Sequence, residues 1–250
     1  MRKIHFIIRG SLAAAVRWEW ITGNPAETAR IPGLPTPDPD PPSSQEAAAL
    51  VNAAWDEGAD WGTLVWLLLV TGVRRAELLA LRWSDVDFES AKLFVRRNHV
   101  RVTGKSIEKD TKTHRTRRLS LDDATVELLS EHRQRYEARC REVGVEPVSS
   151  SYLFSYSPAN DRPCDPSGIT HRYGRMCERL GIDSHPHALR HYSATELLSA
   201  GVDLRTVAGR LGHGGGATTL RVYTAWIDNS DRRADNILSG RLRRPNANGR

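Results

Sequence analysis

The proline-rich stretch at residues 31–45 limits the fold of this chain more than any other feature. Six of the thirteen prolines fall there, most of them in the run Pro-Thr-Pro-Asp-Pro-Asp-Pro-Pro. Proline fixes φ and has no N–H to donate, so neither a helix nor a central strand can cross this stretch. Proline-rich sequence is instead extended and semi-rigid, as in a spacer between folded units. We therefore expect a short unit at residues 1–30, a linker at 31–45, a main domain at 46–242 and a disordered tail at 243–250.

The composition predicts a folded protein with a basic surface. Of the 250 residues 39% are hydrophobic, which is enough for a core and excludes a wholly disordered chain. The net charge is +6, and 31 of the 36 basic residues are arginine, whose guanidinium pairs bidentately with phosphates. A surplus of this size is also common in proteins that bind no nucleic acid. It raises the expectation of a nucleic-acid partner without establishing it.

Neither a membrane span nor an exported protein is expected. The longest apolar run, residues 64–70, is far shorter than the roughly 20 residues that a spanning helix needs. The N-terminal residues lack the cleavage pattern of a signal peptide. The three cysteines are odd in number and form no CxxC pair, so they suggest neither a disulfide framework nor a cysteine-rich zinc module. We expect a soluble, cytoplasmic protein.

Hydrophobic periodicity and capping signals predict a mainly α-helical α+β fold, with helices around a small antiparallel sheet. Helices are expected at residues 11–21, 43–56, 61–70, 75–81, 122–143, 166–180, 187–200, 204–211 and 230–242. Strands are expected at residues 93–95, 100–102 and 118–121. Ser43 and Glu46 form a capping-box signature, and Gly72, Gly201 and Gly212 mark helix ends.

Five short stretches of the main domain carry polar residues in arrangements that suit chemistry on a phosphate. In the first, at residues 71–78, Arg74 follows a helix-ending glycine and Glu77 lies three residues on, on the same helical face. In the second, at residues 110–118, Lys112 lies in a turn between predicted strands, and residues 101–120 hold seven basic against two acidic residues. A hairpin tip so charged could reach a phosphate backbone.

The other three stretches lie nearer the C-terminus. His187 and Arg190 stand one turn apart at the start of a predicted helix, a spacing that can hold two oxygens of one phosphate. His213 follows a helix-ending glycine, and Tyr223 comes ten residues later. Each stretch alone has a plainer interpretation: a surface ion pair, a solvated turn, a capping histidine or a packed tyrosine.

Together, in this order and at these spacings, the five stretches resemble the catalytic domain of the tyrosine recombinases, the phage-type integrase family. The resemblance is closest at residues 71–87 (TGVRRAELLALRWSDVD) and 185–223, and it extends from about residue 43 to residue 226. It implies the catalytic fold of that family and an enzyme of site-specific DNA recombination and integration. Such an enzyme needs no cofactor. Its implied partners are double-stranded DNA, further copies of itself in a tetramer on DNA, and optionally a directionality factor.

The resemblance implies a role for each motif residue in cutting a phosphodiester. Arg74, Arg190 and His213 would hold the non-bridging phosphate oxygens, where fixed cations stabilise the negative charge of the transition state. Glu77 would orient Arg74. These groups would act without a metal ion.

Proton transfer and nucleophilic attack are implied for three further residues. Tyr223 would attack the phosphorus and form a 3′-phosphotyrosyl intermediate, His187 would assist proton transfer or hold the phosphate, and Lys112 would protonate the leaving 5′-oxygen. Lys105 and Lys109 lie on the same basic segment and compete with Lys112 for that role.

Basic residues in and beside the predicted hairpin are expected to bind the DNA backbone. They are Arg101, Lys105, Arg115, Arg117 and Arg118. A zinc site is not expected. His187 and His191 have the i,i+4 spacing of a zincin helix, but Ala188 stands in place of its glutamate.

The chain departs from the family pattern ahead of the catalytic domain. Family members ordinarily carry a helical core-binding domain there, and residues 1–30 resemble only its C-terminal helix. Three functions stay open: a recombinase, a type IB topoisomerase-like enzyme that shares the phosphotyrosine step, and a non-catalytic DNA-binding remnant. The long linker and the predicted helix after Tyr223 favour the recombinase.

Overall fold

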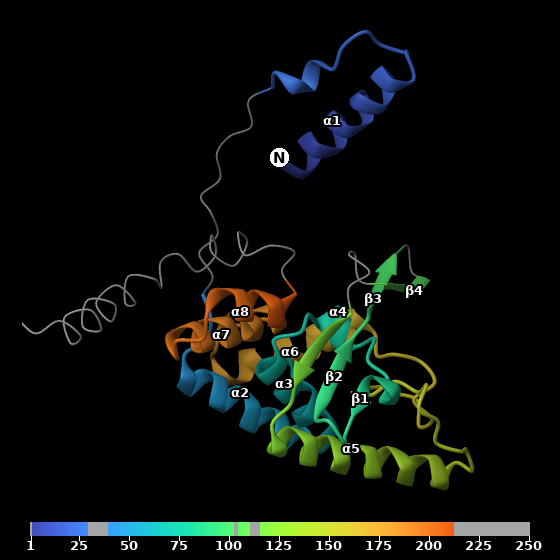
Figure 1. Ribbon diagram of the computed structural model, residues 1–250, viewed down its shortest axis with the longest axis vertical. Coiled ribbons are helices and arrows are strands. Elements are labelled where there is room, and N and C mark those ends of the chain that lie inside the picture. The colour runs from blue at the N-terminus through green and yellow to red at the C-terminus, as the bar shows by residue number, and fades with distance from the viewer. Residues whose placement is uncertain (1, 30–39, 103–104, 111–115, 213–250) are drawn as a thin grey trace, which may run out of the picture. The chain divides into compact units, whose positions relative to one another are not determined.

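The computed structural model describes residues 2–29, 40–102, 105–110 and 116–212. The chain divides into two compact units, Met1–Asp38 and Pro39–Arg250. In the first unit, helix α1 (Arg2–Arg17) precedes a short 3₁₀ turn at Pro25–Glu27 (Figure 1). The side-chain amide of Asn24 donates to the Arg9 carbonyl at 3.0 Å and so ties the turn to the helix.

Helix α1 begins well before residue 11, where the sequence predicted its start. Gly10 is unfavourable inside a helix, where a glycine costs about 1 kcal/mol relative to alanine. The residues before it contain no proline and no run of turn formers, so the helix continues through the glycine.

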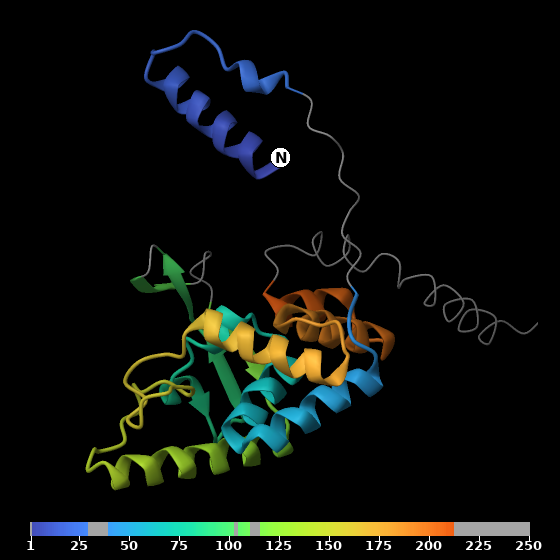
Figure 2. The same ribbon diagram turned by 180° about the vertical axis from the view of Figure 1, so that it is seen from behind.

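The second unit is mainly helical with two small antiparallel sheets, which confirms the predicted fold class (Figures 1 and 2). Its helices are α2 (Ser44–Glu57), α3 (Ala59–Thr71), α4 (Arg75–Leu78), α5 (Asp123–Glu142), α6 (Pro166–Leu180), α7 (Pro186–Ser199) and α8 (Leu204–Leu211). Its strands are β1 (Val86–Asp87), β2 (Lys92–Val95), β3 (Arg97–Val102), β4 (Lys105–Asp110) and β5 (Arg117–Ser120). Among the described residues, no helix is long and apolar enough to cross a membrane.

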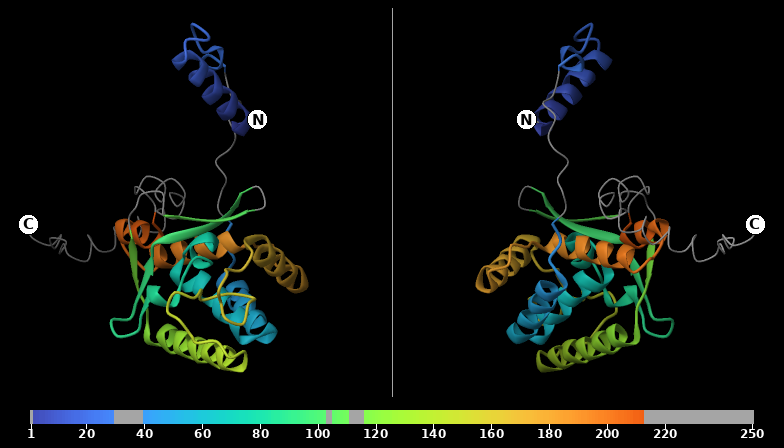
Figure 3. Two further views of the ribbon diagram at one scale, coloured as in Figure 1. Left: turned by 90° about the vertical axis from the view of Figure 1, so that its right-hand side faces the viewer. Right: turned by 90° about the vertical axis from the view of Figure 1, so that its left-hand side faces the viewer.

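The strands form a three-stranded sheet in the order β1-β2-β5 and a separate hairpin of β3 and β4. Figure 3 shows the hairpin reaching away from the sheet. Strand β4 and the two-residue β1 were not predicted. The sequence of β4, Lys-Ser-Ile-Glu-Lys-Asp, lacks an alternating apolar pattern, and it becomes a strand because every residue pairs with one of β3, from Val102↔Lys105 to Arg97↔Asp110.

Local signals fixed several helix ends as predicted, but α1 ends at Arg17 and not at residue 21, and α4 ends at Leu78 and not at residue 81. The Ser43 hydroxyl and the Glu46 carboxylate cap α2 reciprocally. Gly72 and Gly212 end α3 and α8 in the left-handed conformation, with φ of 62° and 67°. Helix α7 begins one residue earlier than predicted, with His185 as its cap, because Pro186 suits the first helical position. The helix predicted at 230–242 and the tail predicted at 243–250 lie outside the described residues.

Helix α3 is the centre of the core. It packs against α2, α5 and α7, and eight of its residues are buried, so its apolar surface runs round the helix as expected for a fully enclosed element. The buried residues are Trp61, Gly62, Thr63, Leu64, Val65, Leu67, Leu68 and Thr71. Strand residues Leu93, Val95 and Leu119 join the same core.

A polar cluster ties α5 to the start of α3. The Asp60 carboxylate accepts hydrogen bonds from the side chains of Arg135 and Arg139 and lies 3.1 Å from Nδ1 of the buried His132. Burial raises the pKa of Asp60, but the three basic neighbours outweigh it and hold that pKa well below its usual range. The carboxylate is therefore ionised at neutral pH, as an acceptor for the two guanidinium donors must be.

Gly72 brings α3 and α8 into contact. A Cβ at this position would lie 2.6 Å from Cδ2 of Leu211, the last residue of α8. Two properties of glycine are therefore needed here, its access to positive φ and its small size. Because Arg74 follows two residues later, the backbone conformation and close packing of Gly72 also help to position Arg74.

Replacing Gly72 by alanine should destabilise the fold. The left-handed backbone alone costs an alanine about 1–2 kcal/mol, and Leu211 must also move aside. The matched control is Gly174→Ala in α6, where a Cβ meets nothing within 4 Å and the helical backbone favours alanine, so stability should be unchanged or higher by up to about 1 kcal/mol. Urea denaturation of both variants measures the difference. Equal stability of the two would contradict this account of Gly72.

Candidate active site

Arg74 and Glu77 form a partly buried ion pair at the start of α4. The Arg74 backbone N–H donates to Glu77 Oε2 at 2.8 Å, and Arg74 Nη1 donates to Oε1 at 3.0 Å. The Glu77 side chain is only 5% exposed, whereas that of Arg74 is 43% exposed. The contact that the spacing predicted is therefore present, and it leaves part of the Arg74 guanidinium open to solvent.

Arg190 lies buried at the junction of three segments. Its side chain, on α7, donates from Nη1 to the Gly72 carbonyl at 2.5 Å and from Nη2 to the Leu211 carbonyl at 2.6 Å. Gly72 comes two residues before Arg74, and Leu211 comes two residues before His213. One guanidinium thus holds together the segments that lead into two of the predicted phosphate-binding residues.

His187 lies on the first turn of α7 among other basic groups. Its ring centroid is 4.7 Å from that of His191 and 6.4 Å from that of His185, which caps the helix. Although solvent still reaches the ring, partial burial lowers the pKa of His187 to about 4, and the charges of His191, Arg190, His185 and Arg74 act in the same direction. His187 is therefore a neutral imidazole at pH 7, able to accept a proton.

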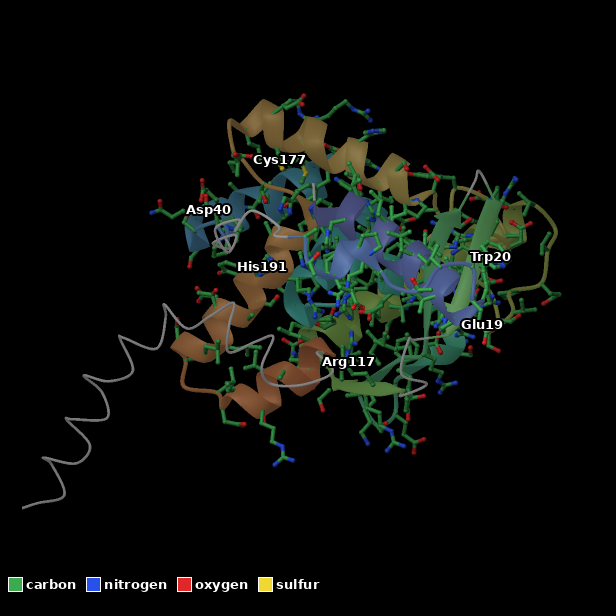
Figure 4. The ribbon with its side chains drawn as sticks, turned by 90° about the horizontal axis from the view of Figure 1, so that it is seen from above. Glu19, Trp20, Asp40, Arg117, Cys177 and His191 are labelled. Atoms are coloured by element: carbon green, nitrogen blue, oxygen red, sulfur yellow. The ribbon has the colours of Figure 1, made fainter. Side chains whose placement is uncertain are left out.

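Arg117 lies in a different place from the one the sequence suggested. It was expected on the DNA-facing hairpin, but its side chain is 11% exposed and donates to both Glu77 oxygens, from Nη2 at 2.8 Å and from Nη1 at 3.3 Å. Figure 4 shows Arg117 on the part of β5 that adjoins α8, and His191 on α7. One signal was available: Arg117 alternates with the buried Leu119, so both point to the inner face of β5.

A hydrogen-bonded cluster fixes the β3–β4 hairpin to the body of the unit. Glu108 of β4 accepts from Arg82 Nη2 at 3.0 Å and from the Tyr152 hydroxyl at 2.9 Å. Arg97 of β3 donates to the buried Asp85 at 2.5 Å. The base of the hairpin is thus held in place at Glu108, two residues before the end of β4.

Several predicted site residues are not placed by the structure. Lys112, Arg115, His213 and Tyr223 lie outside the described residues, as do the side chains of Arg101 and Lys105. Arg118 is exposed on the outer face of β5, with its guanidinium 5.9 Å from the Phe94 ring centre. The roles predicted for these residues stay predictions.

The described residues contain no group of three or more histidine, cysteine or acidic side chains arranged to hold a metal ion. They do contain a cluster of hydrogen-bond donors, two of them positively charged arginines and one a neutral histidine. Arg74, His187 and Arg190 come from the starts of α4 and α7, and the charges of both arginines act on the His187 ring. Such a cluster suits the stabilisation of charge on a phosphate oxygen.

A family model described as "Phage integrase family" matches residues 43–229. Among curated proteins, the chain is 33% identical over 168 residues to a "Tyrosine recombinase XerC-like" of Caldanaerobacter subterraneus, covering 62% of this chain and 42% of that protein. It is 29% identical over 219 residues to the "Prophage integrase IntR" of Escherichia coli, covering 82% of this chain and 52% of that protein. The chain spans about half the length of the curated relatives it matches.

Solved structures share the fold. The Tn1549 transposon integrase in complex with transposon right-end DNA matches with a TM-score of 0.72 at 19% identity, over 90% of this chain and 76% of that one. The XerA recombinase matches with a TM-score of 0.58 at 27% identity, over 88% of this chain and 72% of that one.

The neutral state of His187 has a measurable pH dependence. A histidine of the unfolded chain has a pKa of about 6.5, so between about pH 6.5 and pH 4 the unfolded state binds a proton that the folded state excludes, and stability falls as the pH is lowered through that window. We expect the His187 ring signals in NMR spectra to titrate near pH 4, and at a higher pH in the Arg74→Ala variant, which removes a nearby charge. The His187→Gln variant assigns the signals. A midpoint at pH 6 or above would contradict the environment described for His187.

Proposed function

Because the chain belongs to the phage integrase family, we propose that it is a site-specific tyrosine recombinase, which cleaves and rejoins double-stranded DNA through a 3′-phosphotyrosyl intermediate. The convergence of Arg74, His187 and Arg190 carries the proposal. These side chains supply the positive charge and the neutral base that transfer of a phosphodiester between two hydroxyls requires. Tyr223, ten residues beyond His213, is the proposed nucleophile.

The reaction exchanges one phosphate ester for another. The Tyr223 oxygen attacks the scissile phosphorus, the bond from phosphorus to the 5′-oxygen breaks, and a 3′-phosphotyrosine and a free 5′-hydroxyl result. A 5′-hydroxyl from a partner strand then attacks the phosphotyrosine and releases Tyr223. Because each step forms one ester and breaks one, the reaction requires no ATP and no water.

The residues of the site have two roles in this proposal, stabilisation of negative charge and proton transfer. Arg74 and Arg190, with His213, stabilise the negative charge on the non-bridging oxygens as the transition state forms. The neutral His187 accepts the Tyr223 proton or donates to the phosphate. Lys112 gives a proton to the leaving 5′-oxygen.

We propose DNA as the substrate. Membership of the phage integrase family supports this, as does the similar fold of the Tn1549 integrase, which was solved in complex with DNA. Exposed Arg118 and the basic residues of the hairpin would contact the backbone. Assembly as a tetramer on DNA and regulation by a directionality factor complete the proposal. In the proposed domain plan, residues 1–30 form the end of a core-binding domain, 31–45 a linker and 46–242 the catalytic domain. The three buried free thiols fit a cytoplasmic location.

The first test is covalent capture. Incubation with a nicked duplex built from the DNA that flanks the gene should trap a protein–DNA adduct, since the nick lets the 5′-hydroxyl strand diffuse away. Tyr223→Phe deletes one hydroxyl and keeps the ring, so the adduct should vanish while DNA binding remains. Denaturing gels and mass spectrometry of the adduct measure this. An adduct that persists in the variant, or that maps to another tyrosine, would show that Tyr223 is not the nucleophile.

The second test isolates proton delivery. Arg74→Ala, Arg190→Ala and Lys112→Ala should each slow cleavage by about a hundredfold, as the loss of one transition-state donor does. On DNA with sulfur in place of the scissile 5′-oxygen, only Lys112→Ala should recover, because a thiolate leaves without protonation. Cleavage rates of each variant on the two substrates decide the point. Recovery of all three variants, or of none, would show that Lys112 is not the acid.

A further inference from the structure

Glu77 is shared between two arginines that come from distant parts of the chain. Its Oε1 accepts from Nη1 of Arg74 at 3.0 Å and from Nη1 of Arg117 at 3.3 Å. Its Oε2 accepts from the Arg74 backbone N–H at 2.8 Å and from Nη2 of Arg117 at 2.8 Å. Each oxygen of a nearly buried carboxylate is therefore bonded to both residues.

The two arginines differ in what else they can reach. The Arg117 side chain is 11% exposed and that of Arg74 is 43% exposed. Arg117 also fills the space beside Gly212, the residue that ends α8, where a Cβ would lie 3.0 Å from the Arg117 Cζ. Arg117 is thus enclosed between α4 and the end of α8, whereas Arg74 faces outward.

Arg117 contributes a second positive charge next to the Glu77 carboxylate. A buried carboxylate is costly unless a cation balances it, and without Arg117 the only side-chain hydrogen-bond donor to Glu77 in the described part of the chain would be Arg74. Arg74 alone would then have to neutralise the charge of Glu77. With Arg117 present, the three groups together carry one net positive charge, and Arg74 is the more exposed of the two cations.

We propose that Arg117 is a positioning residue for DNA cleavage: it neutralises Glu77 and so leaves the charge of Arg74 available to the scissile phosphate. This role rests on the proposed function. It assigns Arg117 to the interior of the site and not to the DNA backbone, where the sequence suggested it. The hydrogen bonds and charge of Arg117 also hold the pKa of Glu77 below its usual value against the effect of burial.

The two roles for Arg117 predict different salt dependence. A residue that contacts a DNA phosphate contributes about one unit to the slope of log binding constant against log salt concentration. A residue that acts through Glu77 contributes nothing to that slope. It changes instead the rate of cleavage once all the DNA is bound.

The experiment measures single-turnover cleavage of the nicked duplex at saturating protein, and DNA binding as a function of salt. Arg117→Met should slow cleavage by about tenfold to a hundredfold, the loss expected when a catalytic group is misplaced by about 1 Å, and leave the salt slope unchanged. Arg117→Lys keeps the charge and should recover part of the rate. The control is Arg133→Met on α5, which breaks a solvent-exposed pair with Glu137 on the same helix and should cleave at the unchanged rate.

A double-mutant cycle tests whether Arg117 acts through Glu77. In the Glu77→Gln background no carboxylate needs a cation, so adding Arg117→Met should slow cleavage by less than about threefold. If Arg117→Met alone unfolds, as melting would show, the Glu77→Gln and double variants still decide the question, because neither of them buries a carboxylate without a cation.

Each outcome has one meaning. Equal cleavage rates for the unchanged chain and Arg117→Met would overturn the role of Arg117. So would a loss confined to binding with a shallower salt slope, or an equal loss in the Glu77→Gln background. Failure of the unchanged chain to form any adduct would instead overturn the proposed function, and the role of Arg117 with it.

Discussion

The buried guanidinium of Arg190 holds the second unit together where its chemistry is expected. A charge in the interior is strongly unfavourable unless it is hydrogen-bonded, and Arg190 donates to the carbonyls of Gly72 and Leu211. Both carbonyls are at the C-terminal ends of helices, α3 and α8, where they lack helical partners and carry partial negative charge. The same two bonds therefore partner the cation and pair one carbonyl at each helix end, and they set the segments leading to Arg74 and His213 beside α7.

A second constraint is the balance of charge around Glu77. Positive groups gather at this site, and they repel one another unless an anion lies between them. Glu77 is that anion for Arg74 and Arg117, while His187 avoids adding to the repulsion by staying neutral at pH 7. The site thus contains several basic residues, yet the net charge it presents to a phosphate depends on how each one is paired.

Much of the fold followed from local sequence. The Ser43 capping box and the glycines at 72 and 212 act within one helical turn, and all appear as predicted. The start of α1 and strands β1 and β4 did not follow, for two reasons. Helix α1 continues through Gly10 although glycine disfavours a helix, and the polar strand β4 owes its conformation to its partner β3 and to the contacts of Glu108 with Arg82.

By itself the sequence determined the order and spacing of the motifs, the family, and the contact between Arg74 and Glu77, because these depend on residues a few positions apart. Only the tertiary structure decided which residue Arg117 contacts on the inner face of β5. Arg117 reaches Glu77 across 40 positions of sequence because β5 pairs with β2 in the register Val95↔Arg117 and because Gly212, from a third segment, leaves room for its guanidinium. Contacts of that kind are set by the packing of the whole unit, and no local pattern encodes them.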